Sequence, residues 1–140
     1  MPKKKEKRYR IEVSESQLRM IADCVEDCHR FMGGQVELSN CTSMLDNMRE
    51  VHEKLMEVYP LVVPELARQH GRGASYGWSG GSCPNKHQRK FLAASYYLYR
   101  EILHFFACQR KDNDWNVYRS STLTCEDSGE PIKIDRKSVV

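Results

Sequence analysis

The chain has 140 residues, of which 40% are hydrophobic and 29% are charged, and its formal net charge is +3. This composition is ordinary for a globular protein, and a chain of this length can bury roughly two thirds of its unfolded surface. No apolar run of about 18 residues is present, which excludes a membrane-spanning helix. The N-terminus also lacks the apolar core of a secretory signal. We therefore expect a cytoplasmic protein with one domain over residues 8–140, preceded by a disordered basic arm over residues 1–7.

The charge is segregated along the sequence. Residues 1–10 carry +5, and residues 68–90 carry another +5 without any acidic residue. Because the whole chain carries +3, the remaining residues carry −7. A chain that is acidic outside two basic segments indicates a local site for an anion, and not a surface that coats nucleic acid.

The first predicted element is a strand. The stretch "RYRIEV" alternates polar and apolar residues, which would place Tyr9, Ile11 and Val13 on one side of an extended backbone.

A helix is predicted next, over about 15–33. Ser14 and Gln17 have the spacing of a capping box, which is typical of a helix N-terminus. The pair Gly33-Gly34 ends the helix, because glycine is the preferred residue just after a helix C-terminus. The apolar residues that recur at helical spacing, and that we expect to be buried, are Leu18, Ile21, Val25, Cys28 and Met32.

A second helix is predicted over 41–59. Pro60 would stop it, because proline removes a backbone N–H and clashes with the preceding turn. Its apolar face, which we expect to fill the core, consists of Met44, Met48, Val51, Leu55 and Val58.

The longest predicted helix covers 86–109. Asn85 is a favourable N-cap, and Gln88 follows at the capping-box position. The middle of this helix is apolar on most faces, so we expect several neighbouring elements to bury it.

The last part of the chain changes its period from helical to alternating. The segment "WNVYRSSTLTCEDSGEPIKID" alternates with a period of two and carries a turn signal at Asp127-Ser128-Gly129, which predicts a β-hairpin. A further strand over 115–118 could join it. With the N-terminal strand, these would form a small antiparallel sheet. The predicted fold class is therefore α+β, with three helices packed against this sheet.

The six cysteines have no framework spacing and are interpreted as reduced thiols in a cytosolic protein. Cys24, Cys28 and His29 lie close together in the sequence, but no second pair of ligands accompanies them. We therefore predict no metal site, and no cofactor is indicated.

One pairing favours an enzyme. Cys83 and His87 lie four residues apart across the start of the third helix, and a helix N-terminus lowers the pKa of a thiol. No cysteine-protease signature or G-x-S-x-G motif surrounds them. The prediction is a non-catalytic protein, and a Cys83 nucleophile is the alternative.

The segment "GRGASYGWSGGSCPNKHQRK" over 71–90 combines glycine, aromatic and basic residues without a carboxylate. Glycines let backbone N–H groups approach a ligand, and the following helix N-terminus favours a phosphate. Lys86 and Arg89 would contact the phosphate, while Tyr76 and Trp78 would stack on a base. No P-loop or G-x-G-x-x-G pattern is present. The segment predicts a site for a nucleotide-like anion, and the alternative is a surface loop beside basic helix-capping residues.

The region "VSESQLRMIADCVEDCHRFMGGQVEL" resembles the first helix of small phage-encoded proteins, with Ser-x-x-Gln-Leu at its start and Arg-Phe-x-x-Gly-Gln at its end. The order of elements and the segment "NVYRSSTLTCE" are also similar. These phage proteins include the Thoeris anti-defence sponges. Their known properties imply an oligomer that binds a cyclic ADP-ribose-type immune signal without cleaving it, and some members hold cyclic oligonucleotides at separate sites.

The resemblance also implies site residues. Arg30 would lie near a ligand phosphate, with Gln35 in the same motif, and Arg119 would contact the ligand from the C-terminal strands. Further contacts would come from Thr122 or Thr124, and stacking from Tyr76, Trp78 or Trp115. The glycine-rich segment 68–84 has no counterpart in the family. The alternative for Arg30 is a surface ion pair with Glu26, four residues earlier.

Together these features predict a phage protein that binds and sequesters a phosphate-bearing nucleotide immune signal, either of the cyclic ADP-ribose type or a cyclic oligonucleotide. It would be a homo-oligomer in the host bacterial cytosol, without a membrane partner. The alternative function is a small phage regulator that binds nucleic acid or a host protein through the basic arm and the glycine-rich loop.

Overall fold

A computed structural model describes residues 6–35, 38–62, 86–110 and 116–136. Within these ranges the chain forms four α-helices and two short 3₁₀-helices, and no β-strand. The α-helices are α1 (Glu15–Met32), α2 (Ser39–Thr42), α3 (Met48–Val62) and α5 (Lys86–Gln109). The 3₁₀-helices are η1 (Val117–Arg119) and η2 (Glu126–Ser128).

The predicted α+β fold is wrong, because the described part of the chain is helical. The "RYRIEV" segment is not a strand of a sheet, and Tyr9 and Ile11, which were expected on one strand face, are 85% and 77% exposed. In place of the hairpin turn, Asp127 and Ser128 lie in η2. The predicted strand over 115–118 is replaced in its described part by η1. Alternation alone does not make a strand, since a strand also needs a partner for its backbone groups.

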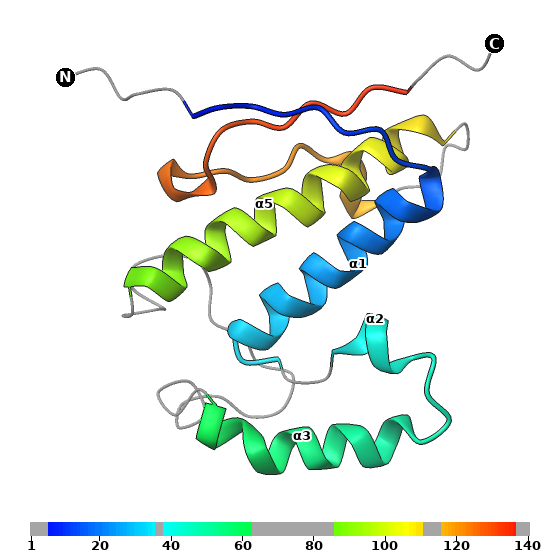
Figure 1. Ribbon diagram of the computed structural model, residues 1–140, viewed down its shortest axis with the longest axis vertical. Helices are drawn as coiled ribbons and strands as arrows, with labels where there is room; N and C mark the ends of the chain where they lie inside the picture. The colour runs from blue at the N-terminus through cyan, green and yellow to red at the C-terminus, as the bar shows by residue number, and fades with distance from the viewer. Residues whose placement is uncertain (1–5, 36–37, 63–85, 111–115, 137–140) are drawn as a thin grey trace.

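Helices α1 and α5 run antiparallel and form the centre of the fold (Figure 1). Ala22 of α1 is fully buried against Ile102 and Phe106 of α5. At the opposite end of α1, the Gln88 amide donates a hydrogen bond to the backbone carbonyl of Met32. Burial of one large apolar side chain contributes about 1.5–3 kcal/mol. This helix pair is therefore the main source of apolar stabilisation in the described part of the chain.

The start of α1 confirms the predicted capping box. The Ser14 hydroxyl accepts a hydrogen bond from the Gln17 N–H at 3.2 Å, and the Gln17 side chain accepts one from the Ser14 N–H at 2.8 Å. The buried side of α1 differs from the prediction. Ile21 is 39% exposed and Cys28 is exposed, whereas Ala22 is buried completely. The small Ala22 side chain lets α1 approach α5 closely.

The limits of α5 match the predicted range 86–109, whereas its predicted cap Asn85 lies outside the described residues. Helix α5 is covered from several sides, as its sequence predicted. Leu92 and Ala93 are almost fully buried, and Tyr97 and Tyr99 are 7% and 4% exposed.

The predicted helix over 41–59 is in fact two helices, α2 and α3. Pro60 does not stop the second one, which ends two residues later at Val62. Part of the predicted apolar core face is wrong, because Met44, Met48 and Val58 are 79%, 41% and 46% exposed. Val51 and Leu55 are half-buried.

A buried carboxylate from α1 caps the short helix α2. The residue before α2, Leu38, has a left-handed backbone (φ 49°) and offers no polar side chain. Asp27, which is 2% exposed, accepts hydrogen bonds from the backbone N–H groups of Asn40 at 3.1 Å and Cys41 at 2.8 Å. The Asn40 N–H is one of the donors that a helix leaves without an internal partner at its start, and the Cys41 N–H is shared between Asp27 and the Leu38 carbonyl at 3.0 Å. Asp27 therefore ties α2 to α1.

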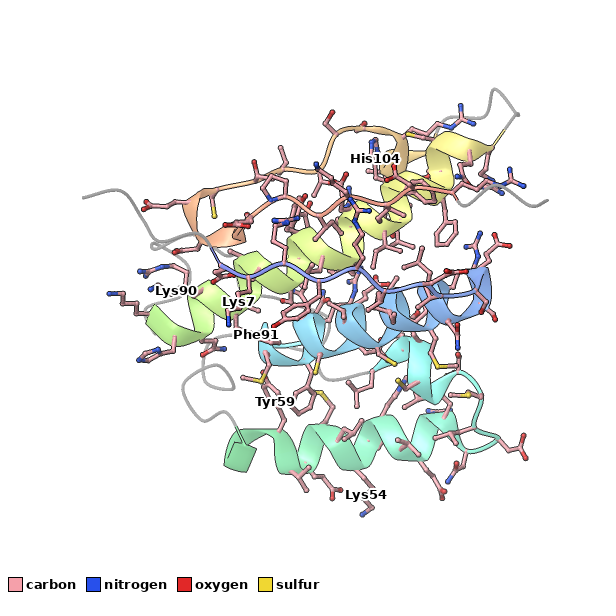
Figure 2. The ribbon with its side chains drawn as sticks, turned by 45° about the horizontal axis from the view of Figure 1, so that its top comes forward. Lys7, Lys54, Tyr59, Lys90, Phe91 and His104 are labelled. Atoms are coloured by element: carbon pink, nitrogen blue, oxygen red, sulfur yellow. The ribbon has the colours of Figure 1, made fainter. Side chains whose placement is uncertain are left out.

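Within the described part of the chain, polar contacts near both of its ends attach helix α3. The Tyr59 hydroxyl, which Figure 2 places between α3 and α1, donates to the Phe31 carbonyl at 2.8 Å. The two rings also meet edge to face at 5.1 Å. The Thr42 hydroxyl donates to the Leu38 carbonyl, so the His52 Nε2 must be the donor in its 2.8 Å contact with Thr42.

The N-terminal and C-terminal extended segments lie side by side across the helix pair (Figure 1). The Arg8 guanidinium binds the Glu130 carboxylate at 2.6 Å and the Pro131 carbonyl at 2.8 Å. The N–H of Ile132 donates to the Tyr97 hydroxyl at 3.0 Å, and Ile132 packs against the core together with Ile134. Side chains therefore hold these segments where a sheet was predicted. None of the described helices combines the length and the apolar character needed to cross a membrane.

Replacement of Asp27 tests its role as the cap of α2. Asp27→Ala removes the acceptor of the Asn40 N–H, whereas the Cys41 N–H keeps its 3.0 Å contact with the Leu38 carbonyl, and an unsatisfied buried group costs about 1–3 kcal/mol. We expect the free energy of unfolding, measured by urea denaturation, to fall by about 1–3 kcal/mol. Glu53→Ala is the control, since Glu53 forms an exposed 3.6 Å pair with Arg49, and such pairs contribute about 0–1 kcal/mol. Equal losses in the two variants would contradict the capping role.

Candidate functional site: an arginine–tyrosine cluster

Arginine and tyrosine side chains from three elements gather on one side of the α1–α5 pair. On α5, Arg89, Tyr96 and Arg100 are spaced by seven and four residues, so they lie on one side of the helix. The Arg100 guanidinium carbon lies 4.7 Å from the centre of the Tyr118 ring and 5.5 Å from that of Tyr96. The arginine–tyrosine cluster, as we define it, consists of Arg30, Tyr96, Tyr99, Arg100 and Tyr118.

Two hydrogen bonds position Tyr118. The Asn116 side chain accepts from the Tyr118 N–H at 2.9 Å and so caps η1. The Tyr118 carbonyl accepts from Nδ1 of His104 on α5 at 2.7 Å. The ring of Tyr118 is thereby held against Arg100, although the two residues lie in different elements.

Arg30 reaches the cluster from the end of α1. Its Nε and Nη2 atoms each lie 3.0 Å from a Glu26 carboxylate oxygen, and its Nη1 donates to the Gln35 side chain at 2.8 Å. The alternative interpretation of Arg30, an ion pair with Glu26, is confirmed. Burial lowers the pKa of Arg30, but the Glu26 carboxylate, with Tyr99 and Tyr118, outweighs this effect and raises it overall. The Arg30 side chain is still 41% exposed.

Tyr99 is the buried member of the cluster. Burial is the main cause that raises the pKa of its hydroxyl to about 12, while Arg30 acts in the opposite direction. Its phenol is therefore neutral at physiological pH. The other tyrosines of the cluster, Tyr96 and Tyr118, are half-buried and keep part of their rings accessible.

His29 contacts two tyrosines of the cluster and is uncharged near pH 7. Its ring centre lies 5.8 Å from that of Tyr96 and 5.4 Å from that of Tyr99. The Ser95 hydroxyl donates to the Phe91 carbonyl at 2.7 Å, so His29 Nδ1 is the donor in its 3.0 Å contact with Ser95. Burial, followed by the charge of Arg30, lowers the pKa of His29 to about 4.

The structure brings together only some of the predicted site residues. Arg30 and Gln35 are in direct contact, and Arg89 lies on the same side of α5 as the cluster. Arg119 is directed elsewhere, since its guanidinium donates to the Arg110 carbonyl at 3.0 Å beyond the end of α5. Lys86 on α5 is exposed.

Two of the remaining predicted residues, Thr122 and Thr124, lie within the described part of the chain. The Thr122 hydroxyl is buried and has no hydrogen-bond partner in the described part of the chain, whereas Thr124 is exposed. The three predicted stacking residues lie outside the described residues: Tyr76, Trp78 and Trp115. Cys83, the alternative nucleophile, also lies outside them, and His87 is exposed on the first turn of α5.

Sequence reasoning missed Tyr96, Arg100 and Tyr118. For Tyr96 and Arg100 the signal is the run "YYLYR", where aromatic residues and an arginine occur within five positions of α5. Because apolar residues surround this run, the sequence predicts it as part of a buried helix. Tyrosine and arginine combine a flat face with polar groups, so half-buried examples of them can also line a binding surface.

The described residues contain no group of three or more His, Cys, Asp or Glu side chains that could hold a metal ion. His29, which follows Cys28 in the sequence, is directed toward Ser95 of α5, while Cys24 and Cys28 are exposed on α1.

Comparisons of the chain with protein-family models, with curated proteins and with solved structures each returned no significant match. The resemblance to phage anti-defence proteins therefore stays a prediction.

His29 makes stability depend on pH. Because its pKa falls from 6.5 to about 4 on folding, the unfolded chain binds the proton more tightly. The native state is thus fully favoured above about pH 6.5 and loses stability as the pH falls toward 4, by on the order of 2–3 kcal/mol. The variant His29→Gln should lose less stability between pH 7 and pH 4 than the unmodified chain in urea titrations. His87→Gln, at an exposed histidine of α5, is the matched control, and an equal effect of both variants would contradict the assignment to His29.

Proposed function

We propose that the chain is a non-catalytic binding protein for a small phosphate-bearing nucleotide, and that the arginine–tyrosine cluster is its binding surface. The single observation that carries the proposal is the Arg100 guanidinium, which lies over the rings of Tyr118 and Tyr96 while Arg30 approaches from α1. Guanidinium groups bind phosphates through paired hydrogen bonds. Aromatic rings stack on bases. The cluster combines both on one face.

The charges within the cluster suggest different roles for its arginines. The Arg30 guanidinium is already bound to the Glu26 carboxylate, so its positive charge is largely compensated. For Arg100, the described residues include no carboxylate within ion-pair distance; its neighbours are tyrosine rings. Arg100 would therefore be the principal phosphate contact, and Arg30 would orient the ligand and hold Gln35 in place.

The ionisable groups around the cluster are suited to retention of a ligand, not to its cleavage. A general base should have a pKa near the working pH. The Tyr99 hydroxyl, with a pKa of about 12, and the His29 imidazole, with a pKa of about 4, both lie far from neutrality. Sequestration alone would then lower the concentration of free ligand.

The resemblance of the first helix to phage anti-defence proteins suggests which nucleotide to try first. A cyclic ADP-ribose-type signal or a cyclic oligonucleotide offers both a stackable base and phosphate groups. The proposal extends to a homo-oligomer in the host bacterial cytosol, for which solution mass by light scattering is the direct measurement.

The test is calorimetric titration of the full chain with cyclic ADP-ribose, cyclic dinucleotides and linear ADP-ribose, followed by recovery of the ligand after denaturation. We expect one of these ligands to bind and to be recovered unaltered. Arg100→Ala should weaken that binding by about 10- to 100-fold, because a hydrogen bond to a charged group contributes about 1.5–3 kcal/mol. The matched control is Arg49→Ala, which removes an equally charged, 92% exposed side chain from α3 and should change affinity less than about twofold.

A salt series separates this function from nucleic-acid binding. A polyanion binder that contacts 6–10 phosphates loses roughly 10³- to 10⁵-fold in duplex affinity between 50 and 200 mM salt. A small nucleotide in the cluster should show a much weaker dependence. Tight, steeply salt-dependent binding of duplex or single-stranded DNA without small-ligand binding would overturn the proposal in favour of a nucleic-acid regulator. Recovery of a chemically altered nucleotide would overturn it in favour of an enzyme.

A further inference from the structure

The N-terminal extended segment carries exposed apolar side chains that the proposed function does not use. Tyr9 and Ile11, which are 85% and 77% exposed, are among the three most exposed large hydrophobic side chains of the described residues. Together with the half-buried Val13 they follow a period of two, which places all three on one side of an extended backbone. None of them belongs to the core cluster formed by α1 and α5. We call residues 9–13 the pairing segment.

The backbone of the pairing segment offers hydrogen-bonding groups to a partner. In the described part of the chain, no backbone–backbone hydrogen bond involves Tyr9, Arg10 or Ile11. The C-terminal segment runs beside them (Figure 1), but the Arg8 side chain joins the two by binding the Glu130 carboxylate. An extended backbone whose N–H and C=O groups lack protein partners is a template for pairing with another chain.

The order of residues in the pairing segment is complementary to itself. In an antiparallel pair, residues directly opposite each other project to the same face. Two copies therefore match apolar with apolar residues only if one residue lies opposite its own counterpart, on a two-fold axis. With Arg10 or Glu12 on the axis, like charges face each other, and with Tyr9 or Val13 on it, only part of the segment pairs. With Ile11 on the axis, Arg10 of each copy faces Glu12 of the other, and Tyr9 faces Val13.

From this complementarity we infer that two copies of the chain associate through residues 9–13, paired antiparallel about a two-fold axis at Ile11. In this register Arg8 lies opposite Ser14, so the Arg8–Glu130 ion pair and the Ser14 cap of α1 can both remain. The pairing joins two molecules and does not restore the sheet predicted within one chain. It defines an interface for the proposed homo-oligomer, lies outside the arginine–tyrosine cluster and does not depend on nucleotide binding.

The inferred contact is small, and interfaces below about 1,200 Å² are typical of weak, reversible association. We therefore expect a dimer with a dissociation constant on the order of 10–100 µM. The measurement is sedimentation equilibrium of the full chain, without nucleotide, from about 5 to about 500 µM, a range that brackets this constant.

Charge reversal tests the register. Arg10→Glu places two pairs of like charges in the dimer, and Glu12→Arg does the same with the opposite sign. Each variant should raise the dissociation constant by about tenfold or more, because like charges directly opposite each other destabilise paired strands. An equimolar mixture of the two variants should dimerise again, since every glutamate of one copy then faces an arginine of the other. The matched control is Arg49→Glu, the same charge change at a 92% exposed side chain of α3, which should leave the dissociation constant within about twofold.

Ile11→Lys is a second variant, because it places two like charges on the axis itself and should also weaken the dimer. Circular dichroism checks that each variant keeps its helices, which is expected since Arg10, Ile11 and Glu12 are exposed. A chain that stays monomeric over the whole concentration range would overturn both the interface and the homo-oligomer, and leave nucleotide binding to its own titration. A dimer that Arg10→Glu does not weaken would overturn the interface alone. Failure of the mixed variants to associate would overturn the register and with it the inference.

Discussion

The antiparallel contact between α1 and α5 is the constraint on which the other elements depend. Ala22 allows the two helices to approach closely, and Ile102 and Phe106 fill the contact from the α5 side. Every further described element is attached to this pair by side chains. Asp27 of α1 holds α2, Tyr97 of α5 holds the C-terminal segment, and that segment in turn holds Arg8.

The same contact determines where polar groups can collect. Glu26 accepts hydrogen bonds from Arg30, one turn later on α1, and from the Asn40 amide of α2. Arg30 is thereby held toward Tyr99 and Tyr118, while α5 supplies Arg100 from the other side. The arginine–tyrosine cluster is thus a product of helix pairing, although no single stretch of sequence contains it.

Local signals in the sequence predicted the two long helices well. The capping box at Ser14 and the long apolar run of α5 specify structure through neighbours three or four residues away, so the limits of α1 and α5 agree closely with the prediction. The predicted strands were wrong for the opposite reason. Tyr9 and Ile11 alternate correctly, but a strand depends on a distant partner, and the described residues supply only side-chain contacts such as Arg8 to Glu130.

In the candidate site, too, contacts between residues close in the sequence could be predicted, whereas contacts between distant residues could not. The pairing of Arg30 with Glu26 could be read from their spacing of four, and the Arg30–Gln35 contact lies within one motif. The approach of Tyr118 to Arg100 could not be predicted, because it requires η1 to fold back over α5 through the His104 hydrogen bond. Arg119, one residue further along, is directed to the Arg110 carbonyl instead. Of these two neighbouring residues in η1, Tyr118 belongs to the cluster and Arg119 does not.

Helix α3 has few contacts with the rest of the described chain, and this affects how the molecule unfolds locally. Near its two ends α3 is held by Tyr59 and His52, while Met48, Met56 and Val58 lie partly in solvent. Local opening requires less free energy where few apolar groups are buried. Amide protons of α3 should therefore exchange with solvent through a partial detachment that leaves α1 and α5 paired. Slow exchange in this molecule would be concentrated in the two central helices, and α3 would behave as a separate cooperative unit.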